Sequence, residues 1–291
     1  MILVTGATGH FGKKAVNFLI DKGVCTSHIG ALARNEQKTD DLRRLGVQIK
    51  LGNYDDYDSL VKAFQGVDKL LFVSGSEIEK RGTQHENVVK AAKEAGVRRI
   101  VYTSFDRAND DKNSPIASIA NVHIETEERI MESGMDYTFL RNAIYSEYVP
   151  LFLGPNVLER GIYLPAESGA APYASRADMA EAAANVLIKE GHINKAYKTV
   201  NIRNYTFAEV AHLISDLTKV KVEYVSPKED EFSSALLSAG MPQATLDGIL
   251  GWMRGLREGY FESIYSDLEM LLGRKPMDLR TSLEKAYVNK Q

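Results

Sequence analysis

The chain has 291 residues, of which 44% are hydrophobic and 26% are charged, and its net charge is -3. This composition is that of an ordinary globular protein, long enough for one domain or a fused pair. The small negative charge gives no sign of binding to nucleic acid or an anionic membrane. No apolar run approaches the roughly 18 residues of a membrane span, and the N-terminus predicts a core strand, not a signal peptide. Cys25 is the only cysteine, so no intramolecular disulfide forms and a cytoplasmic location is expected.

Strands and helices are predicted to alternate through the first half of the chain. Glycines at positions 23, 46, 66, 96 and 134 fall just after the predicted helices, where a glycine cap is favoured. Short loops between alternating strands and helices indicate a parallel sheet that is covered on both faces. The predicted strands span residues 2–4, 28–33, 47–50, 69–73, 99–102 and 137–140, and the predicted helices span 13–22, 36–45, 57–64, 83–95 and 118–133.

The six strands form two halves of three, as in a doubly wound, Rossmann-type α/β fold. We place this domain at residues 1–142, with later segments returning to it. A smaller, mostly helical substrate lobe is expected at residues 143–291, packed on the first domain as a cap. It is predicted to begin with a loop-rich stretch. Its predicted strands are 161–164, 196–202 and 221–225, and its predicted helices are 176–189, 206–218, 232–238, 243–252, 260–272 and 281–287.

Three glycines between the first strand and the first helix spell Gly-x-x-Gly-x-x-Gly. Gly6 allows a tight turn, Gly9 lets the backbone approach a pyrophosphate, and Gly12 lets the helix pack close to the strand. The helix N-terminus adds unpaired N–H groups and a partial positive charge. The turn therefore predicts a dinucleotide site. Its loop is Gly6, Ala7, Thr8, Gly9, His10 and Phe11.

Arg34 directly follows the second predicted strand. Enzymes that use NAD usually carry Asp or Glu at this place, whereas an Arg accommodates a 2′-phosphate. No acidic residue occupies the strand end, and Lys38 lies one helical turn further on. A solvated surface arginine is the alternative interpretation. The predicted cofactor is NADP(H), with Arg34 at its 2′-phosphate.

Eight segments between residues 1 and 225 carry a family resemblance. They read VTGATGHFG, ALARN, GNYDD, LLFVSGSE, YTS, HIETE, YTFLRNAIYSE and YASRADMAEAAA. Together they resemble the NmrA-like atypical short-chain dehydrogenases, and most of all the type-2 NAD(P)H:quinone oxidoreductases. The helical C-terminal tail matches more loosely.

The resemblance implies three further cofactor-binding segments. The first lies beside the adenosine and ribose, the second borders the nicotinamide, and the third completes the pocket. Ser175 and Asp178 of the third segment are alternatively caps of the helix that follows. The segments are Ser74, Gly75 and Ser76; Asn142, Ala143, Ile144, Tyr145, Ser146 and Glu147; and Tyr173, Ala174, Ser175, Arg176, Ala177 and Asp178.

The chain departs from the ordinary short-chain dehydrogenases at the catalytic pair. Their Tyr-x-x-x-Lys is absent, and His123 and Glu127 stand at the corresponding places. His123 is either an acid oriented by Glu127 or a structural histidine, and the structural role is favoured because a quinone needs little acid–base help. Tyr145 is the other catalytic candidate, as a stacking face or proton donor, with a core aromatic as the alternative. His85 is expected to be a solvated histidine on a helix face.

The resemblance implies an NADPH-dependent reductase that transfers hydride to a quinone or a similar conjugated carbonyl. The alternative is a redox sensor of the NmrA type, which binds NADP(H) without turnover. A sugar-nucleotide epimerase or dehydratase is disfavoured because those enzymes keep the catalytic tyrosine. No residues have metal-ligand spacing, so no metal is predicted. The expected partner is a small quinone-like molecule, not nucleic acid or a membrane, and a homodimer is left open.

Overall fold

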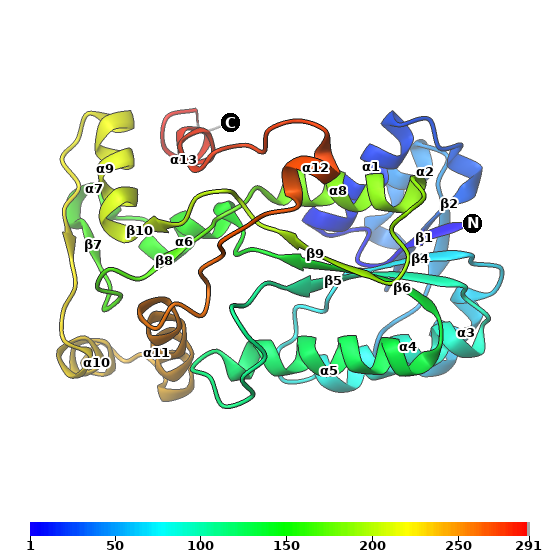
Figure 1. The fold of residues 1–291 in the computed structure, drawn as a ribbon, viewed down its shortest axis with the longest axis horizontal. Coiled ribbons are helices and arrows are strands. Elements are labelled where there is room, and N and C mark those ends of the chain that lie inside the picture. Colours follow the sequence, from blue (N-terminus) through cyan, green and yellow to red (C-terminus); the bar gives the residue numbers. More distant parts are fainter. Residues whose placement is uncertain (290–291) are drawn as a thin grey trace.

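The computed structural model describes residues 1–289, and its centre is a parallel sheet of seven strands (Figure 1). The strand order is β3-β2-β1-β4-β5-β6-β9, so the order reverses between β1 and β4. In such open sheets a ligand binds outside the carboxyl ends of the strands at the point of reversal. The strands are β1 (Ile2–Val4), β2 (Ile29–Ala33), β3 (Gln48–Leu51), β4 (Lys69–Phe72), β5 (Arg99–Phe105), β6 (Asp136–Asn142) and β9 (Lys195–Thr199).

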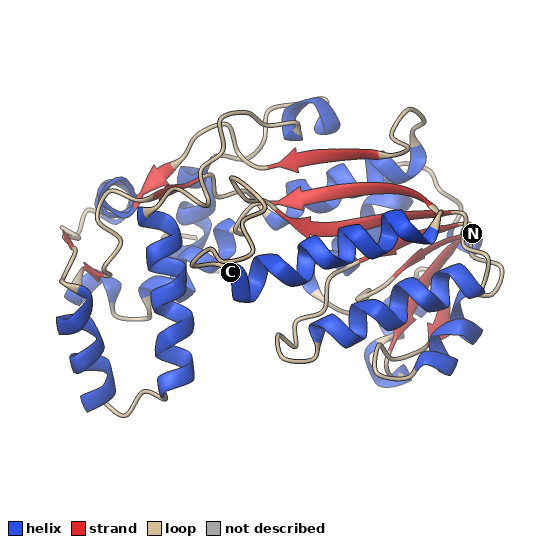
Figure 2. Cartoon of the chain, turned by 60° about the horizontal axis from the view of Figure 1, so that its bottom comes forward, coloured by secondary structure: helices blue, strands red, loops and turns tan. Residues whose placement is uncertain are grey.

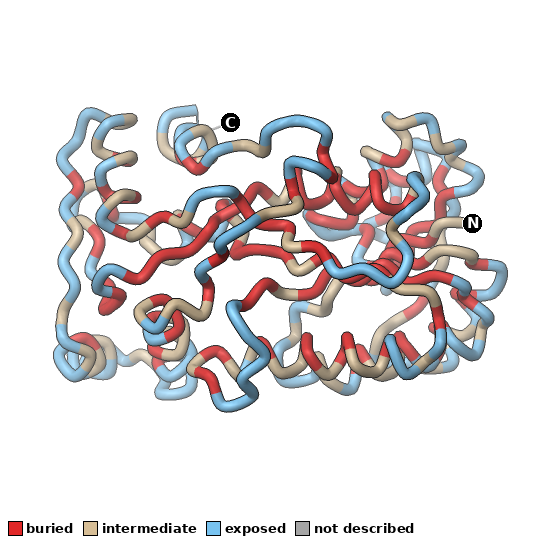
Figure 3. Tube along the Cα trace, viewed as in Figure 1, coloured by how far each residue is buried: buried red, intermediate tan, exposed pale blue. Residues whose placement is uncertain are grey.

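Helices cover both faces of this sheet (Figure 1). One face is covered by α1, α2, α8 and α12, and the other by α3, α4 and α5, with a separate apolar cluster beneath each layer. Figure 3 shows that the buried residues follow the strands and the inner sides of these helices. The helices are α1 (His10–Asp21), α2 (Asp40–Arg44), α3 (Tyr57–Phe64), α4 (Arg81–Glu94), α5 (Ala117–Ser133), α8 (Arg176–Ile188) and α12 (Leu268–Leu272), with 3-10 turns at Thr26–His28 and Glu36–Lys38.

A second lobe lies beyond the carboxyl ends of the strands, and the strand arrows in Figure 2 point toward it. It has an apolar cluster of its own, which includes Val149, Phe207, Leu250 and Leu279. Its sheets are the pairs β7–β11 and β8–β10. Its elements are a 3-10 turn at Ser146–Tyr148, α6 (Val149–Leu153), α7 (Val157–Arg160), β7 (Ile162–Tyr163), β8 (Ala170–Ala171), β10 (Tyr205–Thr206), α9 (Phe207–Thr218), β11 (Tyr224–Val225), α10 (Glu229–Ser238), α11 (Gln243–Arg257) and α13 (Leu279–Tyr287).

The predicted doubly wound fold is confirmed, and elements from the second half of the chain complete it, among them β9 and α8. Strand β9 pairs in parallel with β6 as the seventh strand. Helix α8 packs against α1 on the face shown at the top of Figure 1. Ala180, Ala183 and Ala184 of α8 are fully buried, and their small side chains let the two helices approach closely.

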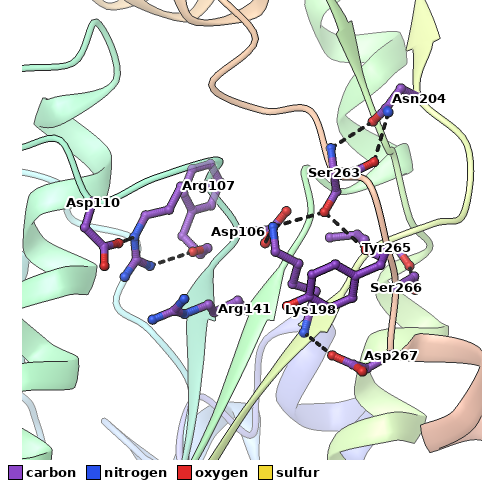
Figure 4. A network of polar contacts seen from close by, with 12 residues as sticks. Asp106, Arg107, Asp110, Arg141, Lys198, Asn204, Ser263, Tyr265, Ser266 and Asp267 are labelled. Atoms are coloured by element: carbon purple, nitrogen blue, oxygen red, sulfur yellow. Dashed lines mark hydrogen bonds and ion pairs between the residues drawn. The ribbon is translucent and has the colours of Figure 1, made fainter.

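The predicted helix at residues 260–272 is wrong except for α12 at its end. Residues 260–267 instead form an irregular segment, the strap, which runs along the outer side of β9 (Figure 4). The Asp267 N–H donates to the Lys198 carbonyl, and the Asp267 carboxylate accepts from the Lys198 N–H, both at 2.9 Å. The Lys198 ammonium lies 3.1 Å from both Ser263 Oγ and Asp106 Oδ1. Pairing with an otherwise open sheet edge thus overrides the local helical pattern.

Two other local predictions need correction. The stretch after Asn142 contains the short helices α6 and α7 where loop was expected. Pro150 stands in the first turn of α6, where its missing N–H leaves no helical bond unmade. The predicted helix at 36–45 is divided into a 3-10 turn and the five-residue α2. The first correction matters for function because α6 forms one wall of the cavity described next.

Candidate functional site

A cavity of about 600 Å³ opens at the carboxyl edge of the sheet, at the reversal between β1 and β4. This volume falls within the range of about 300–1,000 Å³ that is usual for ligand sites. The walls come from the glycine turn, the ends of β2 and β3, the segment after β4, and the start of the second lobe. They are Gly6, Thr8, Gly9, His10, Phe11 and Gly12; Leu32, Ala33 and Arg34; Gly52, Asn53 and Tyr54; Val73, Ser74, Gly75, Ser76, Glu77 and Gln84; and Tyr145, Glu147, Tyr148, Pro150, Leu151 and Arg176.

The glycine turn has the geometry that a phosphate site needs. Gly6 has φ +57, and its carbonyl accepts the Gly9 N–H at 2.9 Å. A Cβ at Gly12 would lie 2.4 Å from the Gly6 carbonyl oxygen, so only glycine lets α1 start this close to β1. Helix α1 has no side-chain cap and no acidic residue in its first turn. Its first N–H groups and its positive end are therefore available to an anion.

Arg34 lines the cavity directly after β2, the strand next to β1 and its glycine turn. Its guanidinium is 3.3 Å from the Glu77 carboxylate, and the two side chains are 71% and 41% exposed. An ion pair this exposed contributes at most about 1 kcal/mol. A phosphate with two charges can displace Glu77 from Arg34, so the pair does not block a 2′-phosphate. Lys38 is exposed on the neighbouring 3-10 turn and does not line the cavity.

An aromatic and cationic group forms the wall that the second lobe contributes. The Tyr145 ring stacks at 6.5 Å from Phe11 and lies 5.4 Å from Tyr148, both between centroids. The Arg176 guanidinium carbon lies 4.8 Å above the Tyr145 ring and 5.2 Å above the Tyr148 ring. Burial raises the pKa of Tyr145 to about 12, although Arg176 acts in the opposite direction. The Tyr145 phenol is therefore protonated at neutral pH and is able to donate a hydrogen bond.

The two segments that carry this wall are brought side by side, although about 30 residues separate them in the sequence. The Ser146 N–H donates to the Ala174 carbonyl at 2.9 Å, and the Ala174 N–H donates to the Ile144 carbonyl at 3.2 Å. The Glu147 carboxylate accepts the Arg176 N–H at the start of α8. These contacts fix Tyr145 and Arg176 relative to each other.

Nine of the fifteen residues named from the family resemblance do not line the cavity. Ser175 caps α8 by accepting the Ala177 N–H, and Asp178 pairs with Arg274 and accepts the Met277 N–H. These contacts agree with the alternative interpretation of Ser175 and Asp178, in which they stabilise the fold and do not bind the cofactor. The site residues that do not line the cavity are Ala7, Asn142, Ala143, Ile144, Ser146, Tyr173, Ala174, Ser175, Ala177, Asp178 and His123.

His123 is buried behind the cavity and does not reach it. It is 5% exposed, and its Nδ1 lies 2.7 Å from the Tyr102 hydroxyl oxygen. Burial lowers the pKa of His123 to about 3, so the ring is neutral. Glu127 does not orient it, because that carboxylate binds Arg107 at 3.0 Å and Arg141 at 2.7 Å. The favoured structural role agrees with this geometry, and the interpretation of an acid oriented by Glu127 does not.

The structure adds lining residues that the sequence did not single out. Tyr54 follows β3, and its hydroxyl donates to the Val73 carbonyl at 2.8 Å, which holds its ring in the cavity. Its place after a strand end was a signal that could have identified it, since all parallel strands end at the same edge. Tyr148 and Leu151 line the mouth and are 40% and 71% exposed. His85, predicted to be solvated, is fully buried against the cavity wall.

Residues 1–289 contain neither a candidate metal site nor a candidate membrane span. In this part of the chain no three His, Cys, Asp or Glu side chains are grouped so as to hold a metal ion. None of the helices in the same range is both long and apolar enough to cross a membrane.

This chain is similar to several reductases. Quinone oxidoreductase 2 of Escherichia coli (strain K12) is 36% identical over 288 residues, which cover 99% of each chain. The NAD(P)H azoreductase of Xenophilus azovorans is 30% identical over 86% of this chain and 85% of its own. A crystal structure of the Escherichia coli NADPH-dependent quinone oxidoreductase with NADPH superposes with a TM-score of 0.90, at 36% identity, and covers 99% of this chain and all of that one.

A second solved structure agrees with the first. The triphenylmethane reductase of Citrobacter sp. with NADP(H) superposes with a TM-score of 0.89 at 36% identity, over 98% of this chain and 100% of that one. The NmrA-like family model matches residues 1–281, nearly the whole chain. The fold, the glycine turn and these matches lead to one conclusion: the chain belongs to the NmrA-like family.

Proposed function

We propose that this chain is a cytoplasmic, NADPH-dependent reductase that transfers hydride to a quinone or a similar conjugated carbonyl. The observation that carries the proposal is one continuous cavity with Arg34 at one end, the uncapped N-terminus of α1 in the middle, and Tyr145 at the other. These three features match, in order, a 2′-phosphate, a pyrophosphate and a flat reacting ring. The relatives that act on quinones and azo compounds support the choice of acceptor.

The residues present fit NADPH, which supplies the hydride when it is bound. The N–H groups at the start of α1 bind the pyrophosphate, and the lack of a Cβ at Gly9 leaves room for it. Arg34 leaves Glu77 to bind the 2′-phosphate. Ser74, Gly75 and Ser76, just beyond β4, line the same cavity, and this wall limits where the ribose can sit.

The chain contributes position and shape to the acceptor site. Tyr145 and Tyr148, with Arg176 above both rings, form a rigid aromatic wall that a planar acceptor can stack on. The Tyr145 hydroxyl holds its proton at neutral pH and can donate a hydrogen bond to an acceptor oxygen. Leu151 and Pro150 of α6 add apolar surface to the same cavity. Positioning of this kind suits an acceptor whose reduced oxyanion is stabilised by resonance.

We expect the purified protein to oxidise NADPH, followed at 340 nm, with at least one member of a panel of benzoquinones and naphthoquinones. A panel of saturated ketones serves as the control, because their reduction needs the Tyr-x-x-x-Lys proton relay that this chain lacks. Tight NADPH binding without oxidation by any quinone would contradict the enzyme and support the redox sensor instead.

Arg34→Ala is expected to weaken NADPH binding and leave NADH binding nearly unchanged. A charge-assisted hydrogen bond contributes about 1.5–3 kcal/mol, so the Kd for NADPH should rise by about 10- to 150-fold. Glu77→Gln is the matched variant: it frees Arg34 without removing it, so NADPH affinity should be kept or improved. Titration of protein fluorescence with both cofactors measures this. Equal losses for NADPH and NADH would show that Arg34 does not read the 2′-phosphate.

A further inference from the structure

The backbone just beyond β4 is held by side chains instead of by strand pairing. The Val73 N–H donates to Thr5 Oγ1 at 2.9 Å, and the Ser74 N–H donates to Thr103 Oγ1 at 2.9 Å. The Gly75 N–H donates to Nε2 of the His85 ring at 3.1 Å. Ser74 and Gly75 form cavity wall on the side that faces the glycine turn. His85 therefore acts on the wall while its own side chain lies outside the cavity.

The hydrogen bonds around His85 determine which ring nitrogen carries the proton. A backbone N–H only donates, so Nε2 must be unprotonated to accept from Gly75. The proton is then on Nδ1, which lies 2.9 Å from Thr126 Oγ1. The Thr126 hydroxyl donates to the Val122 carbonyl at 2.6 Å, which leaves its oxygen free to accept from Nδ1. Along the hydrogen bonds from Gly75 through His85 and Thr126 to α5, each donor thus faces an acceptor.

The surroundings of His85 exclude the doubly protonated ring, in which Nε2 would also be a donor. The side chain is fully buried, and the Tyr102 hydroxyl lies 3.4 Å from its Nδ1. The charged or ionisable groups His123, Arg81 and Arg129 act on it as well, and none of these groups is a carboxylate. Burial, followed by these groups, lowers the pKa of His85 well below its usual value. A neutral ring is thus available to accept from Gly75 throughout the physiological pH range.

When the bond between Gly75 and His85 is lost, the Ser74–Ser76 wall has no room to shift toward α4 and can move only toward the cavity. A Cβ at Gly75 would lie 2.9 Å from the Gln84 side-chain oxygen, so the loop is packed tightly against α4. The Arg81 Nε donates to the Gly75 carbonyl at 2.7 Å and holds the residue from its other side. Without the His85 acceptor, the Gly75 N–H would lie unpaired in this wall, and relief would require the backbone to move toward the cavity.

We propose that His85 is a positioning residue for the cofactor. Thr126 selects the tautomer of His85 that carries its proton on Nδ1. The unprotonated Nε2 of this tautomer accepts from the Gly75 N–H and so keeps the Ser74–Ser76 wall in its binding position. The inference rests on the proposed NADPH site. It adds a residue that lies in the second layer behind the site, and it gives Thr126 a role in cofactor binding although Thr126 does not touch the cavity.

The test is the Kd for NADPH, measured directly by fluorescence titration without an acceptor. We expect His85→Leu to raise this Kd by about 5- to 30-fold, because the Gly75 N–H loses its partner. His85→Gln should stay within about twofold of wild type, because the Gln side-chain oxygen can replace Nε2 as acceptor. The kcat with a quinone at saturating NADPH should change much less than the Kd. Val89→Ala, a buried cavity-forming change on the same helix α4, is the control for general destabilisation.

Thr126→Val supplies the sharper arm of the experiment. In the wild-type background it removes the nearer acceptor for Nδ1–H and leaves only the Tyr102 hydroxyl, at 3.4 Å, so the preference for this tautomer weakens and the Kd for NADPH should rise. In the His85→Gln background there is no tautomer to select, so Thr126→Val should leave the Kd within about twofold. A purely structural contribution of Thr126 would instead give the same change in both backgrounds, and that outcome would overturn the proposal.

Three further outcomes separate this inference from the function on which it rests. If His85→Leu is folded and binds NADPH as tightly as wild type, the inference is overturned and the proposed function is not affected. A rise in Kd for Val89→Ala as large as that for His85→Leu would have the same consequence. Failure of the wild-type protein to bind NADPH would overturn the proposed function together with the inference.

Discussion

Gly9→Val is expected to raise the Kd for NADPH by at least about 100-fold, the loss that follows when two charge-assisted hydrogen bonds to phosphate are blocked. Gly9 is the N-cap of α1, is exposed at the cavity floor and has φ -88, which valine adopts without strain. A Cβ there contacts only the Gly6 carbonyl oxygen, at 3.2 Å. The added side chain therefore occupies the place of the pyrophosphate and leaves the fold intact. Fluorescence titration with NADPH, together with thermal unfolding, measures both effects.

Gly12→Ala is the matched control, because it adds a Cβ to the same turn but on the inner side. This Cβ would lie 2.4 Å from the Gly6 carbonyl oxygen and 2.9 Å from the Ala7 Cα, so the start of α1 must move. We expect Gly12→Ala to lower the unfolding temperature markedly, in contrast to Gly9→Val. If Gly9→Val unfolds as readily as Gly12→Ala, the role of Gly9 is structural. If Gly9→Val binds NADPH normally, Gly9 does not lie at the pyrophosphate.

Glu127→Ala is expected to lower the free energy of unfolding by about 3–5 kcal/mol, the usual cost of removing one partner from a buried ion pair. The Glu127 carboxylate is 3% exposed and accepts hydrogen bonds from Ser104, Arg107 and Arg141. Its loss leaves Arg107, itself 3% exposed, paired only with Asp110. Urea unfolding of wild type and variant at neutral pH measures the difference.

The neighbouring Glu128 provides the control. Its side chain is 46% exposed and pairs with Lys112 on the surface, so Glu128→Ala should cost less than about 1 kcal/mol. Acid adds a second check. Burial raises the pKa of Glu127, but the hydrogen bonds from Arg141 and Arg107 outweigh it and hold the pKa below its usual value. The stabilisation is therefore present above the usual pKa and is lost as pH falls through the lowered one, so acid should narrow the gap between wild type and Glu127→Ala.

Much of the fold could be predicted because its signals are local. The alternation of apolar strands and amphipathic helices is written in neighbouring residues, and so are the glycine turn at Gly6–Gly12 and the position of Arg34 at a strand end. These features depend on backbone conformation and on the period of the hydrophobic pattern, which a single sequence carries. Their predicted positions lie at the cavity in the structure.

Other parts of the site depend on which segments meet in space. The sequence shows His85 as a polar residue on a helix, and only the packing of α4 between β4 and α5 buries it against Gly75 and Thr126. The His123 and Glu127 pair is separated for a similar reason. Both lie on α5, but Arg107, just after β5, and Arg141, on β6, bind the carboxylate.

The sequence by itself determined the strands and helices of the doubly wound sheet and its glycine turn, and it predicted a 2′-phosphate at Arg34, because each of these features depends on residues within a few positions of one another. Only the tertiary structure decided the acceptor wall and the edge of the sheet. Tyr145 and Arg176 meet because two remote segments exchange backbone hydrogen bonds, and the strap gives up its local helical pattern to pair with β9. Contacts between distant segments depend on the free energy of the whole packed chain, and no local pattern encodes them.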